Sequence, residues 1–199
     1  MNLFKTLLAC AGLIVTLSYA NAVSIDEPET SLRTTVDSVL TRLKSNDTKE
    51  AKREFIVKTI NDAFDFPLMS MISLKPEFRK MLTGKNREQY TDLYVKQLQN
   101  SYLDKLELYS NEKIEFEKAY TEGNKVVIPT KVLSGAEAIS MDYKMYNKKG
   151  SWKIYDVVIE GISIVQTYRS QYSEILEKGS VDDLIAKMRE RQESTTQEN

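Results

Sequence analysis

Carboxylates and tyrosines are the residues of this chain that could do chemistry. Asp65, Asp142 and Asp156 stand among apolar or aromatic neighbours, and the chain contains 11 tyrosines. An aspartate base with a tyrosine donor in an apolar site can catalyse proton transfer. Asp156 can instead cap or pair at a sheet, and Asp142 can be the outward residue of an alternating strand. We favour this structural interpretation; an isolated carboxylate deep in a cavity would favour an enzyme.

The composition excludes several other kinds of chemistry. The chain has no histidine. This excludes histidine-based metal sites, Ser-His-Asp and Cys-His nucleophile systems, and the commonest general base near neutral pH. Its seven glycines are scattered and form no phosphate-binding loop. We therefore expect no catalytic residue, no metal site and no cofactor.

The first 22 residues are typical of a cleavable signal peptide. A start containing Lys5 leads into an apolar run too short for a comfortable membrane span, and Ala20-Asn21-Ala22 supplies the small residues of a cleavage site. Acylation of Cys10 is the alternative, but the apolar run continues past this cysteine. We expect cleavage before Val23 and a periplasmic protein without disulfides.

The remaining chain, of about 177 residues, is long enough for one core. Removing residues 1–22 leaves 27 basic and 29 acidic residues, a balance that argues against nucleic-acid binding. We expect a single domain over residues 23–190, a flexible polar tail over 191–199, and a monomer.

Hydrophobic periodicity divides the chain into a helical half and a strand half. Helices are predicted over about 32–43 and 48–64, two short pieces around 68–74 and 76–82, a long helix over 86–109, and two more after Gly161. Four strands are predicted over about 114–116, 126–132, 139–145 and 152–160. The predicted fold is α+β: a curved four-stranded antiparallel sheet wrapped by six or seven helices, similar to NTF2 or cystatin folds.

The inner face of such a sheet can be filled by side chains or can leave an apolar cavity. Met141, Tyr143 and Met145 alternate along one strand, with Tyr102 and Tyr168 on the helices. Flexible methionines suit a surface that accepts variable apolar shapes. The broken apolar segment FPLMSMISLKPEFRKML could act as a lid. Both features favour a cavity.

Three segments carry a resemblance to a known family. They are FDFPLMSMISL, YTDLYVKQLQNSYLDKL and WKIYDVVIEGISIVQTYRSQYSEIL, the last followed by GSVDDLIAKM. The most specific pattern is W-x-x-Y-D-x-x-x-E-G-x-S, which begins at Trp152 and ends at Ser163. From about Leu32 to Met188 the chain resembles the MlaC (toluene-tolerance) family of periplasmic phospholipid-binding proteins.

The resemblance implies a soluble carrier that shuttles a glycerophospholipid and maintains outer-membrane lipid asymmetry. Its partners would be an inner-membrane ABC transporter with an MCE-domain ring and an outer-membrane lipoprotein/porin complex. The acyl chains would lie in the cavity and the headgroup would face water. The family's pocket tyrosine and its apolar residue after the strand-end glycine correspond to Tyr102 and Ile162.

We predict a lipid-binding site lined by residues of the long helix, the sheet and the helix after Gly161. They are Tyr94, Leu98, Tyr102, Leu106, Phe116, Ile128, Met141, Tyr143, Met145, Val158, Ile162, Val165 and Tyr168.

Three alternatives stay open. The protein could carry another apolar ligand, it could be a small NTF2-like enzyme that uses an aspartate and a tyrosine, or it could be an adaptor that binds a partner helix in an exposed groove.

Overall fold

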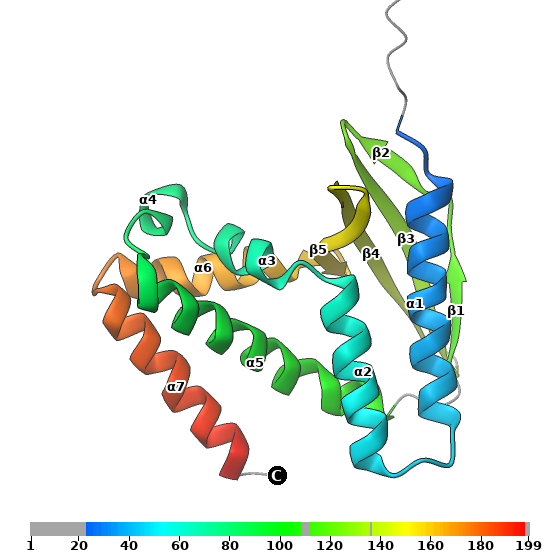
Figure 1. Ribbon diagram of the computed structural model, residues 1–199, viewed down its shortest axis with the longest axis horizontal. Coiled ribbons are helices and arrows are strands. Elements are labelled where there is room, and N and C mark those ends of the chain that lie inside the picture. Colours follow the sequence, from blue (N-terminus) through cyan, green and yellow to red (C-terminus); the bar gives the residue numbers. More distant parts are fainter. Residues whose placement is uncertain (1–22, 109–111, 136, 198–199) are drawn as a thin grey trace, which may run out of the picture.

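The structure is a computed structural model that describes residues 23–108, 112–135 and 137–197 (Figure 1). Side chains are described over the same ranges, apart from those of residues 104–108 and 195–197. The expected signal peptide lies outside the described residues. No helix within the described ranges is long and apolar enough to cross a membrane.

Seven helices and six strands make up the described chain. The helices are α1 (Asp26–Lys44), α2 (Lys49–Ala63), α3 (Phe66–Ile72), α4 (Pro76–Arg79), α5 (Gly84–Leu108), α6 (Ile164–Leu176) and α7 (Val181–Gln197). The strands are β1 (Lys113–Phe116), β2 (Tyr120–Glu122), β3 (Lys125–Ser134), β4 (Glu137–Lys148), β5 (Ser151–Ile159) and β6 (Ile162–Ser163). The predicted α+β class is confirmed.

The sheet is antiparallel and open, with the order β1-β3-β4-β5-β6 and with β2 beside β1 on the same edge of β3. The prediction of four strands was wrong, because β2 and β6 are three and two residues long and too short to show an alternating pattern. Pro129 lies between the part of β3 that pairs with β1 and the part that pairs with β2, where its missing N–H is not needed.

A tight turn explains why β6 was predicted as the start of a helix. Glu160 and Gly161 have φ of 48° and 78°, and positive φ at both central residues is what a two-residue type I′ hairpin requires. The turn folds Ile162 back beside Ile159. Helix α6 therefore begins two residues later, capped by the Ser163 hydroxyl, which accepts a hydrogen bond from the Gln166 N–H at 3.0 Å.

The last helix is longer than expected. The capping box at its start is confirmed: the Ser180 hydroxyl accepts from the Asp183 N–H at 3.2 Å, and the Asp183 carboxylate accepts from the Ser180 N–H at 2.8 Å. α7 then continues to Gln197, through most of the segment for which we predicted a flexible tail.

The helices form two groups around the sheet (Figure 1). Helix α1 lies across the sheet and buries Leu32 and Val36 against it. Helices α3, α5, α6 and α7 pack on one another in a separate core. Phe64 and Ile164 are partly buried apolar residues that pack against both cores, where α2 leads into α3 and where the sheet leads into α6. A third, smaller cluster of Leu43, Ile56 and Leu103 joins α1 and α2 to α5.

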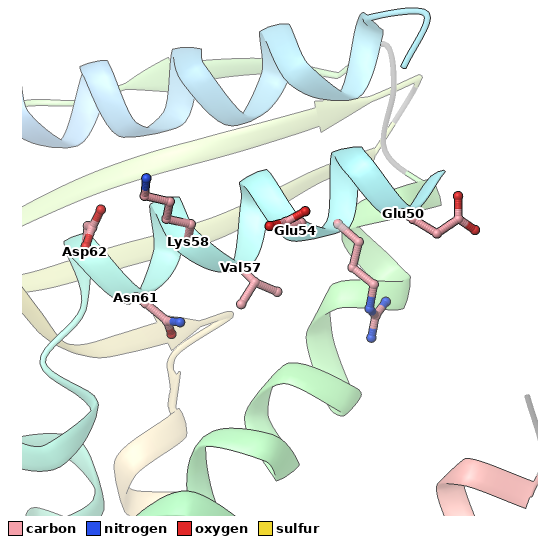
Figure 2. A pocket seen from close by; sticks show the side chains of 7 residues that line it. Glu50, Glu54, Val57, Lys58, Asn61 and Asp62 are labelled. Atoms are coloured by element: carbon pink, nitrogen blue, oxygen red, sulfur yellow. The ribbon is translucent and has the colours of Figure 1, made fainter. Parts of the chain in front are cut away.

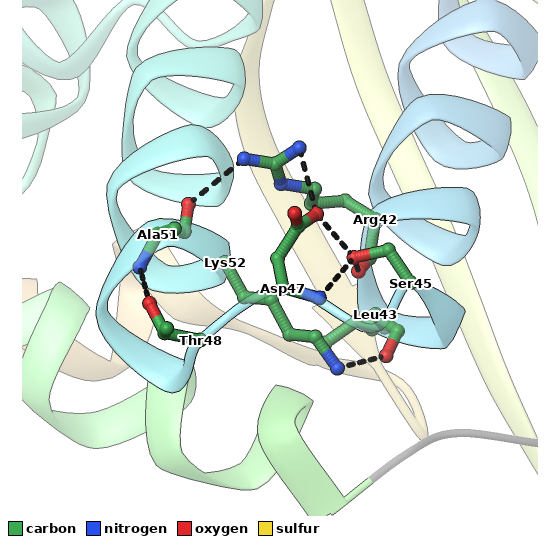
Figure 3. A network of polar contacts seen from close by, with 7 residues as sticks. All are labelled: Arg42, Leu43, Ser45, Asp47, Thr48, Ala51 and Lys52. Carbon is green, nitrogen blue, oxygen red and sulfur yellow. Dashed lines mark hydrogen bonds and ion pairs between the residues drawn. The ribbon is translucent and has the colours of Figure 1, made fainter.

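A polar network fixes the turn between α1 and α2 (Figure 3). The Arg42 guanidinium pairs with Asp47 at 2.9 Å, and the Ser45 hydroxyl bonds the same carboxylate at 2.5 Å. Lys52 of α2 donates to the Leu43 carbonyl at the end of α1, at 2.9 Å. These contacts satisfy groups at the end of α1 and hold the helix pair that covers the sheet.

Candidate functional site

The candidate site is the inner face of the sheet, the face that α1 covers. Strand pairing places Ile128 opposite Tyr143, and Thr130 opposite both Met141 and Phe116. Directly paired residues point to the same side of a sheet. These residues, with Val126 and Met145, belong to the core that contains Leu32 and Val36 of α1.

One half of this inner face, the filled half, is packed with buried side chains, and the other half is partly exposed. In the filled half, Val126, Ile128, Met145 and Ile154 are at most 2% exposed. In the other half the side chains of Phe116, Met141, Tyr143 and Ile159 are only partly buried. Apolar groups left partly exposed along one continuous face are typical of a ligand or partner surface.

Ile162 ends this half of the face at the open edge of the sheet. It pairs with Ile159, which in turn pairs with Met141, so the three side chains form one row across the inner face. Ile162 is 65% exposed, the highest value among the large apolar side chains that the structure describes. The row therefore runs from solvent at the sheet edge toward the core.

Tyr143 lies one row further in, opposite Val157. Part of its side chain is accessible, yet burial raises the pKa of its hydroxyl to about 12. Tyr143 therefore combines an accessible edge with surroundings that are mostly protein. The predicted residues Phe116, Ile128, Met141, Tyr143 and Met145 are thus brought together on this face.

Val158 was predicted at the site and lies on the opposite face. Its cross-strand partner is Asp142, an outward residue. The cause is a β-bulge: Met145 pairs with Ile154 but Lys144 pairs with Asp156, so one extra residue shifts the alternation. Val157 and Ile159 therefore take the inward positions beside Tyr143 and Met141. The polar residue Asp156 within an apolar strand was the available signal of this shift.

Four of the predicted helical residues lie in the helical core and not on the sheet face. They are Tyr94, Leu98, Val165 and Tyr168, all at most 7% exposed. Tyr102 packs half-buried against the same core, and the side chain of Leu106 lies outside the described residues. The helical and sheet residues of the predicted site thus form two groups in the described structure.

The buried tyrosine hydroxyls of this helical core have partners within the protein. Tyr94 accepts from the Ser73 hydroxyl at 3.1 Å, Tyr90 donates to the Ser70 carbonyl at 2.8 Å, and Tyr172 donates to Gln97 at 2.9 Å. Their rings contact edge to face, with Tyr90 and Tyr172 centroids 5.8 Å apart. These tyrosines, with their hydrogen bonds made within the protein, stabilise the packing of the helical core. Burial raises the pKa of Tyr94, so its hydroxyl stays neutral.

The carboxylates singled out as possible bases are engaged elsewhere. Asp156 accepts from the Ser163 hydroxyl at 2.6 Å and from the Val165 N–H at 3.1 Å, so it joins β5 to the start of α6. Asp142 points away from the inner face. Neither lies isolated among the apolar residues of the candidate site.

Asp65 joins the start of α3 to the sheet. It is 3% exposed, accepts from the Leu68 N–H at 3.1 Å and from the Tyr146 hydroxyl, and pairs with Lys148 at 2.6 Å. Burial alone would raise the pKa of Asp65, but the hydrogen bonds from Lys148, Tyr146 and Leu68 outweigh it and hold the pKa below its usual value. This carboxylate stabilises the structure in its ionised form.

The other residues of the W-x-x-Y-D-x-x-x-E-G-x-S pattern hold β5 in place. The Trp152 indole donates to Glu27 of α1 at 3.1 Å, and the Tyr155 ring lies 4.5 Å from the Lys125 ammonium of β3. The Glu160 carboxylate accepts from the Ser140 N–H next to the turn in which Glu160 has a positive φ. The pattern therefore fixes β5 against its neighbours and shapes the turn that follows it.

A surface depression of about 670 Å³ along α2 does not suit acyl chains (Figure 2). Its lining is Glu50, Arg53, Glu54, Val57, Lys58, Asn61 and Asp62. Charged groups of both signs predominate there, whereas a hydrocarbon site must be apolar. No group of three or more potential metal ligands occurs among the described residues.

Fold and site together define an α+β binding protein whose candidate surface is apolar. The sequence profile described as "MlaC protein" matches residues 33–190. The chain belongs to the MlaC family.

Two relatives and one solved structure illustrate the similarity. The "Intermembrane phospholipid transport system binding protein MlaC" of Haemophilus influenzae is 26% identical over 179 residues, covering 85% of this chain and 84% of that protein. The "Toluene tolerance protein ttg2D" of Pseudomonas putida is 21% identical over 180 residues, covering 86% and 84%. The phospholipid-binding protein from Ralstonia solanacearum, solved in complex with a phospholipid, matches with a TM-score of 0.79 at 22% identity, covering 85% of this chain and 99% of that one. This last similarity shows a shared fold.

Proposed function

We propose that this protein is a periplasmic carrier that binds a glycerophospholipid by its acyl chains. The observation that carries the proposal is the half-exposed apolar face from Ile162 through Met141 to Tyr143. The names of the relatives, and the phospholipid bound to the Ralstonia solanacearum protein of the same fold, support a phospholipid as the ligand. The acyl chains would enter an apolar cavity between this face and the helices, with the headgroup in water near Ile162.

The energetics explain why such a protein needs no catalytic group. Burying two chains of about sixteen carbons is worth roughly 25 kcal/mol, at about 0.8 kcal/mol per methylene. A carrier cannot release the lipid into water against that free energy, so it must exchange it with another apolar environment. We propose that this exchange occurs with an inner-membrane ABC transporter bearing an MCE ring and with an outer-membrane lipoprotein/porin complex, and that it maintains outer-membrane lipid asymmetry.

The test places a charge on each face of the sheet in turn. Met141→Lys puts an ammonium on the inner face, where desolvation would oppose lipid binding. Val158→Lys is the matched control, since it adds the same side chain on the outer face opposite Asp142. Delipidated proteins are incubated with vesicles of labelled phosphatidylethanolamine and re-isolated, and the lipid per protein is counted.

We expect Met141→Lys to lose at least ten-fold in lipid loading while Val158→Lys loads as the wild type does. Circular dichroism confirms that both variants are folded. Equal loading of the two variants would contradict the inner face as the lipid site.

A further inference from the structure

The hydroxyl of Tyr143 stands out on the inner face because it has no hydrogen-bond partner among the described residues. Thr130, on the neighbouring strand of the same face, is satisfied: its hydroxyl donates to the Met141 carbonyl at 3.0 Å. The Tyr143 side chain instead lies among Ile128, Val157 and Met141, which offer it no acceptor. A hydroxyl held in apolar surroundings gains free energy from any acceptor brought to it.

The accessible part of Tyr143 makes such an acceptor possible. The side chain keeps some accessible surface on the inner face, while the surrounding protein raises the pKa of its hydroxyl to about 12. The phenol therefore stays neutral across the physiological pH range and acts as a hydrogen-bond donor. A ligand that covers this side chain replaces the water that could otherwise serve its hydroxyl.

The depth of Tyr143 indicates which part of a lipid reaches it. The row formed by Met141, Ile159 and Ile162 opens to solvent at the sheet edge. Tyr143 is two residues beyond Met141 along β4, about 7 Å closer to the filled half of the face at the rise of a β-strand. In a phospholipid whose headgroup lies at the exposed edge, the acyl ester groups follow directly below the headgroup and precede the hydrocarbon.

We propose that the Tyr143 hydroxyl donates a hydrogen bond to an acyl ester carbonyl of the bound lipid, so that the site selects ester-linked over ether-linked lipids. This inference rests on the proposed function and deepens it. The selected feature is the carbonyl acceptor at the junction of headgroup and chains, which a dialkyl ether lipid of the same length and headgroup lacks.

The experiment compares competitive loading of the delipidated full-length protein from vesicles that contain equal amounts of diester and dialkyl ether phosphatidylethanolamine. The ether lipid offers the Tyr143 hydroxyl no carbonyl acceptor, so one hydrogen bond is lost with it. We therefore expect the wild type to prefer the diester by roughly three- to ten-fold. Tyr143→Phe removes only the hydroxyl and should bring the ratio to about one. Tyr120→Phe is the matched control: this tyrosine is 45% exposed and pairs with Val127 on the other face, so the variant should keep the wild-type ratio.

The outcomes separate this inference from the proposed function. If the wild type binds both lipids equally, or if Tyr143→Phe keeps the full preference, the inference is wrong and the carrier function stands. If the wild type binds neither lipid, both are wrong.

A second measurement needs no variant. The infrared carbonyl band of ¹³C-ester-labelled lipid bound to the wild type should shift to lower frequency than in hydrocarbon solvent. A band at the hydrocarbon position would overturn the inference even if Tyr143→Phe failed to fold.

Discussion

Individual residues decide which face of the sheet is available to a ligand. The single bulge near Asp156 moves Val157 and Ile159 to the inner face and Val158 to the outer face. Met141 and Tyr143 could be predicted because β4 keeps an unbroken register with β3. The bulge leaves only one sign in the sequence, the polar Asp156 within an apolar strand, because the partners of this carboxylate, Ser163 and Val165, lie beyond the strand.

The same reasoning applies to the helical tyrosines. Spacing alone predicts that Tyr94 and Tyr102 share a helix face, and the structure confirms that both contact the helical core. Spacing does not show whether that face meets the sheet or other helices. Tyr94 is buried because Ser73, 21 residues earlier in the chain, supplies its hydrogen bond, and such long-range partners are invisible to periodicity.

Asp65 gives a residue-scale prediction about pH. Because the pKa of Asp65 is lowered in the folded protein, its ionised form stabilises the fold above the usual value of 3.8, and this contribution is lost as the pH falls below that value. Asp65→Asn should therefore lower the free energy of unfolding by about 1–3 kcal/mol at pH 7. Urea titrations between pH 7 and pH 3 should show the difference from wild type shrinking toward the acid end.

Asp142→Asn is the control for this prediction, since Asp142 is a partly exposed carboxylate on the outer face. It should change the free energy of unfolding by less than about 0.5 kcal/mol. A pH-independent loss in Asp65→Asn would show that the cause is altered packing and not the loss of the charge.

At the scale of elements, the long helices and strands were predictable and the shortest ones were not. α5 and the strands β3, β4 and β5 each show several repeats of their period. β6 has two residues, and its existence depends on the backbone conformation of Glu160 and Gly161. A strand whose existence depends on a turn conformation leaves no periodic pattern from which it could be predicted.

The turn between β5 and β6 carries a prediction at this scale. Gly161 has φ of 78°, and an added Cβ would meet no atom within 4 Å, so the cost of a side chain is purely conformational. Gly161→Ala should reduce the free energy of unfolding by about 1–2 kcal/mol, while Gly161→Asn should cost less because asparagine tolerates positive φ. Chemical denaturation of the two variants measures both values. Equal costs would indicate that a side chain at this position disturbs contacts and not backbone conformation.

At the scale of the whole molecule, the apolar side chains divide into separate clusters. The sheet with α1 forms one core, and α3, α5, α6 and α7 form another, with shared contacts at Phe64 and Ile164. A third cluster, of Leu43, Ile56 and Leu103, joins α1 and α2 to α5. The half-exposed apolar face belongs to the sheet core.

The most direct test of phospholipid carriage is to identify what the protein binds in its host. The full-length protein is expressed in its host, purified without detergent and extracted with organic solvent, and the extract is analysed by mass spectrometry against the protein concentration. We expect glycerophospholipid at close to a stoichiometric ratio. Folded protein that yields no phospholipid would contradict the proposed function and would favour the enzyme or adaptor alternatives.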